Sequence, residues 1–139
     1  MRKGSIIGVH DIQLAMPEGG EEAARGFYSG LLGIPEVPKP PLQAKRGGVW
    51  FETETVRIHL GVEQDFRPAK KAHPGLLVDD LRSLSKRLAG AGYEVVSGEP
   101  LEAYEHLYVN DRFGNRLELL HRILLLEEAT CFPKKKSTI

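Results

Sequence analysis

Two histidines and two carboxylates occupy positions in this sequence from which they could form one metal site. Asp11 and His59 lie near the start and the end of one segment of the chain, and His73 and Glu118 lie at corresponding places in a second segment. The offsets are similar, because 73 − 11 = 62 and 118 − 59 = 59. Imidazole nitrogens and carboxylate oxygens are ligands for divalent transition metals. If the segments are structural repeats, equivalent strand ends would bring these side chains to one cavity.

The elements that must position these residues follow the same order twice. Residues 8–63 and 72–122 each show the pattern of a strand, a helix and then further strands. Along residues 56–62 apolar side chains alternate with polar ones, which places His59 on the face opposite Ile58 and Leu60. In each segment, apolar residues at helical spacing follow the first predicted strand and predict a helix there. The sequence therefore predicts an α+β fold built from two βαβββ modules.

The predicted elements can be given as residue ranges. We expect a helix over 21–32 that stops at Gly33, and a second helix that is capped by Asp79 or Asp80 and ends at Gly90 or Gly92. Lys39-Pro40-Pro41 is expected to be a loop. The predicted strands are 8–16, 49–53, 56–62, 73–78, 93–97, 106–109 and 116–120.

The length, charge and cysteine content of the chain limit the kinds of protein that it could be. A chain of 139 residues predicts a single domain at 5–123, with module one at 5–65, module two at 70–123 and a tail at 124–139. Basic and acidic residues cancel, at 19 each, which argues against nucleic acid or an anionic membrane as a partner. No apolar run is long enough to span a bilayer, and the single Cys131 has no partner for a disulfide. We predict a cytoplasmic protein.

Several segments together resemble the vicinal oxygen chelate superfamily. They are Phe27-Tyr28 with Leu31-Leu32-Gly33, His73 before Val78-Asp79-Asp80-Leu81, and Asp111-Arg112-Phe113-Gly114-Asn115-Arg116-Leu117-Glu118-Leu119. That superfamily includes glyoxalase I, extradiol dioxygenases, fosfomycin-resistance thiol transferases and bleomycin-binding proteins. The resemblance implies paired βαβββ modules whose mixed sheets curl around a cleft, and it implies a homodimer.

The resemblance also implies a ligand set. Glu118, His73 and His59 match the positions of family ligands, whereas Asp11 stands where the family normally has histidine. The adjacent His10 would point to the opposite face of the strand. A set of two imidazoles and two carboxylates suits zinc, nickel, manganese or iron(II). Glu118 or Asp11 could leave the metal and act as the general base, and Glu118 is our predicted catalytic residue. Alternatively, Asp11 records the loss of the metal.

Two functions remain open on the sequence. The first is a metal-dependent lyase, isomerase, thiol transferase or dioxygenase that acts on a small oxygenated metabolite, with Arg57, Tyr108, Arg116 and Trp50 as substrate-binding candidates. The second is a metal-free drug-binding protein of the bleomycin-resistance type, whose cleft would be lined by Trp50, Phe51 and Tyr108. The sequence suggests no role for His106 or His121.

Overall fold

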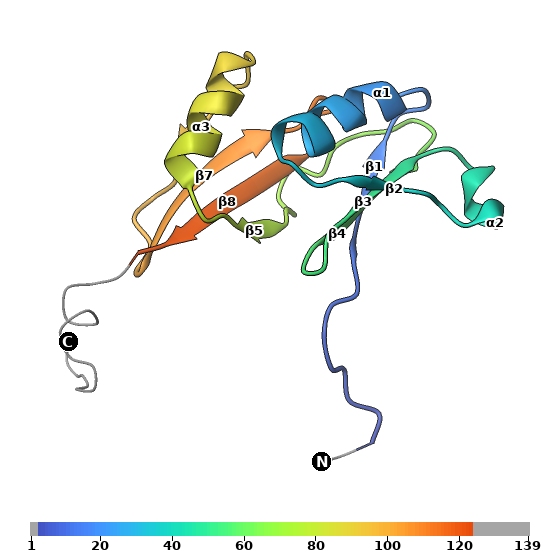
Figure 1. Cartoon of the computed structure of the whole chain (residues 1–139), viewed down its shortest axis with the longest axis horizontal. Coiled ribbons are helices and arrows are strands. Elements are labelled where there is room, and N and C mark those ends of the chain that lie inside the picture. Colours follow the sequence, from blue (N-terminus) through green and yellow to red (C-terminus); the bar gives the residue numbers. More distant parts are fainter. Residues whose placement is uncertain (1–2, 124–139) are drawn as a thin grey trace. The chain divides into compact units, whose positions relative to one another are not determined.

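The computed structural model describes residues 3–123, which fall into two compact units (Figure 1). Unit 1 runs to Ala72 and also contains Asp111–Asn115. Unit 2 contains His73–Asn110 and the residues from Arg116 onward. The predicted tail at 124–139, with Cys131, lies outside the described residues. In Figure 1 unit 1 carries most of the blue and green elements, and unit 2 the yellow to red ones.

Unit 1 is built on a mixed sheet with the strand order β1-β4-β3-β2. Strands β1 and β4 are parallel, and the other neighbours are antiparallel. Its elements are β1 (Ile12–Met16), α1 (Glu21–Ala24), the π-helical segment η1 (Arg25–Leu31), β2 (Glu36–Val37), α2 (Pro41–Ala44), β3 (Val49–Glu52) and β4 (Arg57–Val62). Phe27 and Tyr28 of η1 are buried together with Phe51 and Ile58 of the sheet, and this cluster forms the core of unit 1.

Unit 2 repeats that topology with the strand order β5-β8-β7-β6. Its elements are β5 (Gly75–Leu77), α3 (Leu81–Gly90), β6 (Val96–Ser97), β7 (Tyr104–Asn110) and β8 (Arg116–Arg122). The first strand is again parallel to the last one, β8, which lies beside it. Leu84 and Leu88 of α3 are buried with Leu107 and Leu119 of the sheet. The α+β class and the duplicated module are therefore confirmed.

Helix boundaries follow local rules. The Asp80 side chain accepts a hydrogen bond from the backbone N–H of Ser83 at 3.1 Å, so Asp80 is the N-cap of α3. Gly33 ends the first helix with φ of 79°, a conformation that suits glycine. The predicted loop at Lys39-Pro40-Pro41 is wrong at its end, because Pro41 begins the short helix α2. Proline is tolerated there, since the first helical N–H has no partner within the helix.

Three predicted strands are too long by three or four residues. The predictions at 8–16, 73–78 and 93–97 shrink to β1, β5 and β6. For β1 the reason is the register, which pairs Ile12 with Ile58 of a strand that begins at Arg57. Residues before Ile12 therefore have almost no neighbouring backbone to pair with. Strand β2 had no counterpart among the predicted elements, and β7 is longer than predicted.

The turn Asp111–Asn115 is organised by one buried carboxylate. Asp111 is 5% exposed and accepts four hydrogen bonds. Its Oδ1 accepts the backbone N–H groups of Phe113 and Asn115, each at 2.9 Å. Its Oδ2 accepts the Tyr28 hydroxyl at 2.7 Å and the Asn115 amide at 2.9 Å. The same amide donates to the carbonyl of Ala15 in β1 at 2.8 Å, so this motif holds unit 1 together.

Candidate functional site

The two faces of the β7–β8 pair have different chemistry. Leu107, Val109, Leu117 and Leu119 are buried on the core face. Because strand side chains alternate, Tyr108 and Glu118 lie on the opposite face, where the register places them directly across from each other. His106 and Arg116 have the same parity on β7 and β8 and therefore share this face. The alternation that builds the core thus also assembles a polar cluster.

Glu118 lies between two imidazole rings. Its Oε1 is 3.0 Å from Nε2 of His73, and its Oε2 is 2.6 Å from Nδ1 of His106. His73 reaches it because the backbone N–H of Glu118 donates to the carbonyl of Pro74 at 3.0 Å, next to the start of β5. The side chains of Glu118 and His106 are only 15% and 8% exposed. This arrangement is a largely desolvated carboxylate with a histidine on each oxygen.

His106 is fixed on both sides of its ring. Its Nδ1 faces the Glu118 carboxylate and its Nε2 faces the backbone carbonyl of Glu99, and both of these partners only accept hydrogen bonds. Two acceptors on opposite ring nitrogens favour the protonated form of the His106 ring. Close approach to this loop requires Gly98, because a Cβ added at Gly98 would lie 2.4 Å from the His106 ring.

Both groups of this pair titrate away from their usual ranges. The bond to the Glu99 carbonyl, followed by the Glu118 carboxylate, raises the pKa of His106 above 6.5 despite burial. Burial alone would raise the pKa of Glu118, but the hydrogen bonds from His73 and His106 outweigh it and hold that pKa below 4.5. The two charged forms therefore stabilise each other.

These shifts predict how the pair contributes to stability as the pH changes. The Glu118 contribution is present above pH 4.5 and is lost as the pH falls through the lowered pKa of the folded state. The His106 contribution is present below pH 6.5 and is lost as the pH rises through the raised pKa. We expect the difference in unfolding free energy between wild type and His106→Leu to be largest between pH 4.5 and pH 6.5. Urea denaturation at a series of pH values measures it. A difference that stays constant over about pH 4–9 would contradict this prediction.

Unit 1 holds its histidine in a similar way. Nδ1 of His59 is 3.0 Å from Oδ2 of Asp11, and Nε2 is 2.8 Å from Oε2 of Glu52. Trp50 stacks on the His59 ring with a centroid separation of 3.9 Å and an interplanar angle of 5°. The parallel register makes this possible, because Gln13 pairs with His59 and Asp11 lies on the same face of the strand. His59 is buried, with 3% exposure.

The substrate-binding candidates differ in how they are held. Arg57 approaches Glu52 at 3.7 Å and donates to the carbonyl of His10 at 3.4 Å, so its charge is already partly paired. The guanidinium of Arg116 lies over the Tyr108 ring, with Cζ 4.2 Å from the centroid. Trp50 has one face covered by His59.

The structure brings the predicted ligands together as two pairs, Asp11 with His59 in unit 1 and His73 with Glu118 in unit 2. Sequence reasoning missed Glu52 and assigned no role to His106, although each contacts a predicted ligand. Strand parity could have placed Glu52 opposite Phe51 and His106 opposite Leu107, on the polar face, but their partners depend on the register between strands. Phe51 was predicted to line the cleft, but it lies in the core with 0% exposure.

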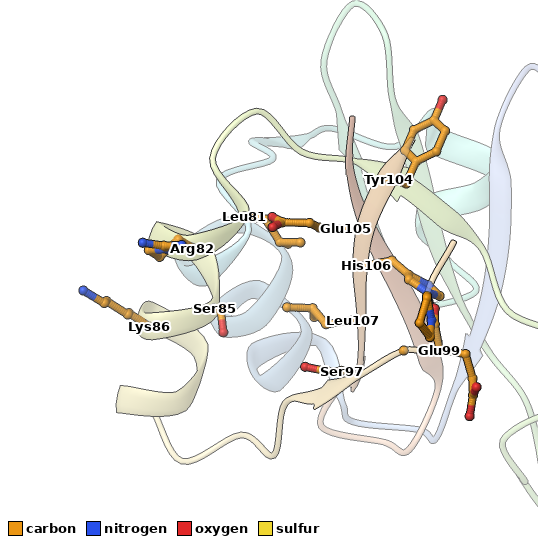
Figure 2. Close-up of a pocket in the computed structure, with 12 residues that line it drawn as sticks. Leu81, Arg82, Ser85, Lys86, Ser97, Glu99, Tyr104, Glu105, His106 and Leu107 are labelled. Carbon is orange, nitrogen blue, oxygen red and sulfur yellow. The ribbon is translucent and has the colours of Figure 1, made fainter. Parts of the chain in front are cut away.

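A hollow of about 480 Å³ lies in unit 2 between α3 and the strands β6 and β7 (Figure 2). Its lining residues include Ser85, Ser97, His106 and Leu107. Figure 2 shows that the charged ends of Arg82 and Lys86 point away from the sheet. Neither His73 nor Glu118 lines this hollow, so His106 is the residue of the polar cluster that it shares.

The chemistry of the two pairs suits a divalent cation. Two neighbouring ligands at about 2.1 Å from an octahedral ion are separated by about 3.0 Å. The nitrogen–oxygen separation is 3.0 Å in both the Asp11–His59 pair and the His73–Glu118 pair. Between residues 3 and 123, no group of three or more His, Cys, Asp or Glu side chains is arranged to hold an ion. The residue types of each pair are therefore suited to a divalent cation, and the same 3.0 Å separations are those of the direct contacts that the pairs form without an ion.

Comparisons with known proteins agree on one family. The model described as "Glyoxalase/Bleomycin resistance protein/Dioxygenase superfamily" matches residues 13–119. A glyoxalase family protein of known structure from Bacillus anthracis is 41% identical, with a TM-score of 0.83, and the match covers 88% of this chain and 100% of that one. None of the curated proteins that were compared matches the chain.

Two further solved structures share the fold at low identity. A glyoxalase/dioxygenase from Nostoc punctiforme is 19% identical, with a TM-score of 0.73 and coverage of 89% of this chain and 97% of that chain. A variant of the fosfomycin resistance protein FosX from Listeria monocytogenes, complexed with Mn(II) and 1S,2S-dihydroxypropylphosphonic acid, is 13% identical, with a TM-score of 0.70 and coverage of 91% and 98%. These two likenesses show the fold alone.

No helix in the described part of the chain combines the length and the apolar character needed to cross a membrane.

Proposed function

Because the chain belongs to the Glyoxalase/Bleomycin resistance protein/Dioxygenase superfamily, we propose that it is a divalent-metal-dependent enzyme acting on a small oxygenated metabolite. The observation that carries this proposal is the His73–Glu118 pair, a desolvated carboxylate and an imidazole separated by 3.0 Å. The FosX variant that shares the fold is complexed with Mn(II), which supports a divalent metal in general.

The proposed ligands are Asp11, His59, His73 and Glu118. In unit 2 the two oxygens of the Glu118 carboxylate have different partners. Oε2 contacts His106, and Oε1 contacts His73. Oε1 is thus the proposed ligating atom. When bound, a divalent cation stabilises developing negative charge on a substrate oxygen and lowers the pKa of bound water.

The proposed chemical roles follow from the geometry of unit 2. Glu118 is the proposed catalytic residue: if its Oε1 left the metal, this oxygen could accept a proton from the substrate while His106 keeps the carboxylate oriented. Arg57, Tyr108, Arg116 and Trp50 are the proposed substrate-binding residues. The proposed reaction is of the lyase, isomerase, thiol transferase or dioxygenase type, with a substrate oxygen held by the metal.

Metal stoichiometry tests the proposal directly. The protein would be purified without an affinity tag, stripped with a chelator and titrated with Mn(II), Zn(II), Ni(II) and Fe(II). We expect about one ion bound per chain by elemental analysis, and a rise in melting temperature, because a ligand at about 100 times its Kd adds about 2.7 kcal/mol to stability. His73→Ala should lose this binding. His10→Ala is the matched control, because His10 is exposed and lies beside a proposed ligand.

The alternative function is metal-free binding of a drug-like molecule, and one observation favours it. His59 already has a carboxylate oxygen at hydrogen-bond distance on each ring nitrogen and an indole against its face, so unit 1 is satisfied without an ion. The same titration separates the two functions. If the stripped protein binds none of the four metals and shows no thermal shift, the hypothesis of a metal-dependent enzyme is excluded and that of a metal-free binding protein remains.

A further inference from the structure

Arg116 is held rigidly by aromatic contact. Its Cζ lies 4.2 Å from the centroid of the Tyr108 ring, within the range of a cation–π interaction. The Tyr108 ring is itself fixed, because the His73 and His106 rings meet it nearly edge-on, each at a centroid separation of 5.6 Å. The guanidinium is therefore oriented before any ligand arrives, which lowers the entropic cost of binding to it.

The positive charge of Arg116 has no acidic partner in the part of the chain that the structure describes, where no carboxylate oxygen lies within 4.0 Å of its guanidinium. Two other arginines, Arg25 and Arg57, are close to carboxylates. Arg25 pairs with Glu36 at 2.8 Å, and Arg57 approaches Glu52 at 3.7 Å. A planar guanidinium with unused N–H groups binds carboxylates and phosphonates through two parallel hydrogen bonds. Arg116 is partly buried, so such a bond would be weakly screened.

The position of Arg116 sets the size of a ligand that could reach both it and Glu118. The two residues are neighbours on one face of β8, and residues two apart on a strand are separated by about 6.6 Å. That span fits a molecule in which an anionic group and a second oxygen function are separated by one or two carbon atoms. In a larger acid the chain between the two polar groups would be longer than the distance between Arg116 and Glu118.

We infer that Arg116 is an anion-recognition residue and that the substrate is a small hydroxy or oxo acid. Its carboxylate or phosphonate binds the Arg116 guanidinium, and its neighbouring oxygen is directed to the His73–Glu118 pair. This inference deepens the proposed function and rests on it for the second contact only. The contact with the anion depends on Arg116 and Tyr108 and requires no ion.

The test uses small probes and isothermal titration calorimetry on the full chain. The probes are glycolate for a carboxylate, hydroxymethylphosphonate for a phosphonate, and glycolamide as the neutral analogue. We expect the acids to bind wild type and glycolamide to bind at least about tenfold more weakly. Arg116→Gln should weaken the acids by about 10- to 100-fold and leave glycolamide unchanged. Arg116→Lys should bind the acids with an affinity between those of wild type and Arg116→Gln, because lysine keeps the positive charge but lacks the planar guanidinium.

Controls separate this inference from the metal proposal. Arg82→Gln removes the same charge from an exposed position on α3 and should bind both acids like wild type. Each titration is run on stripped protein and again with Mn(II). If wild type binds no Mn(II) but the stripped protein still discriminates glycolate from glycolamide through Arg116, the metal proposal fails and the anion site stands. If no acid binds wild type, or if Arg116→Gln binds the acids as tightly as wild type, the anion site is wrong.

Discussion

Replacing Glu118 by alanine is expected to weaken Mn(II) binding by more than about 100-fold, because changes to residues that only support a metal ligand already cost about 10- to 100-fold. The alanine variant loses the oxygen that faces His73 at 3.0 Å. It also removes the carboxylate that Nδ1 of His106 contacts at 2.6 Å, so the His106 ring loses its partner in the cluster. Metal affinity would be measured by calorimetry on stripped protein.

Two further variants make this prediction specific to the cluster. Glu105→Ala removes an equal charge from the exposed, opposite side of β7 and should bind Mn(II) as wild type does. His106→Asn keeps one donor near Oε2 of Glu118 and should cost less than Glu118→Ala, within about 10- to 100-fold. Wild-type affinity in the Glu118→Ala variant would remove this carboxylate from the metal site.

Replacing Asp111 by alanine is expected to destabilise the protein by about 3–5 kcal/mol, because a buried donor left without a partner costs about 1–3 kcal/mol. The variant would remove the carboxylate that accepts from the Tyr28 hydroxyl, the Asn115 amide and two backbone N–H groups, and Tyr28 and Asn115 are both buried. Such a loss is a large share of the stability of a typical domain, which is about 5–15 kcal/mol. Urea denaturation followed by circular dichroism measures it.

The size of this effect can be checked against smaller changes. Tyr28→Phe removes a single donor from the same carboxylate and should cost about 1 kcal/mol. Asp79→Ala removes an exposed carboxylate and should change the stability by less than about 0.5 kcal/mol. If Asp111→Ala were no less stable than Tyr28→Phe, the four-bond arrangement around Asp111 would not contribute to folding as we infer.

Period-two alternation explains which parts of the site were predictable. A strand turns successive side chains to opposite faces, so Ile58 and Leu60 on one face require His59 on the other, and Leu117 and Leu119 do the same for Glu118. The duplicated order of elements was predictable for the same reason, because each module repeats its own hydrophobic pattern. These features depend on residues close together in the chain.

Register decides which residues meet across strands, and the sequence alone does not carry it. His106 meets Glu118 because β7 and β8 pair Tyr108 with Glu118, and Glu52 meets His59 because β3 and β4 pair Trp50 with His59. A slip by one residue would have turned either partner into the core. The role of Asp111 was hidden for a similar reason, since its partner Tyr28 lies 83 residues away in the chain.

The sequence by itself determined the α+β class, the repeated module and the strand faces of His59 and Glu118, because hydrophobic periodicity and turn chemistry are local properties. Only the tertiary structure decided that Glu118 is held by His106 as well as His73, that Phe51 is in the core, and that Arg116 lies on Tyr108 without an acidic partner among the described residues. Those outcomes depend on strand register and side-chain packing between segments distant in the chain.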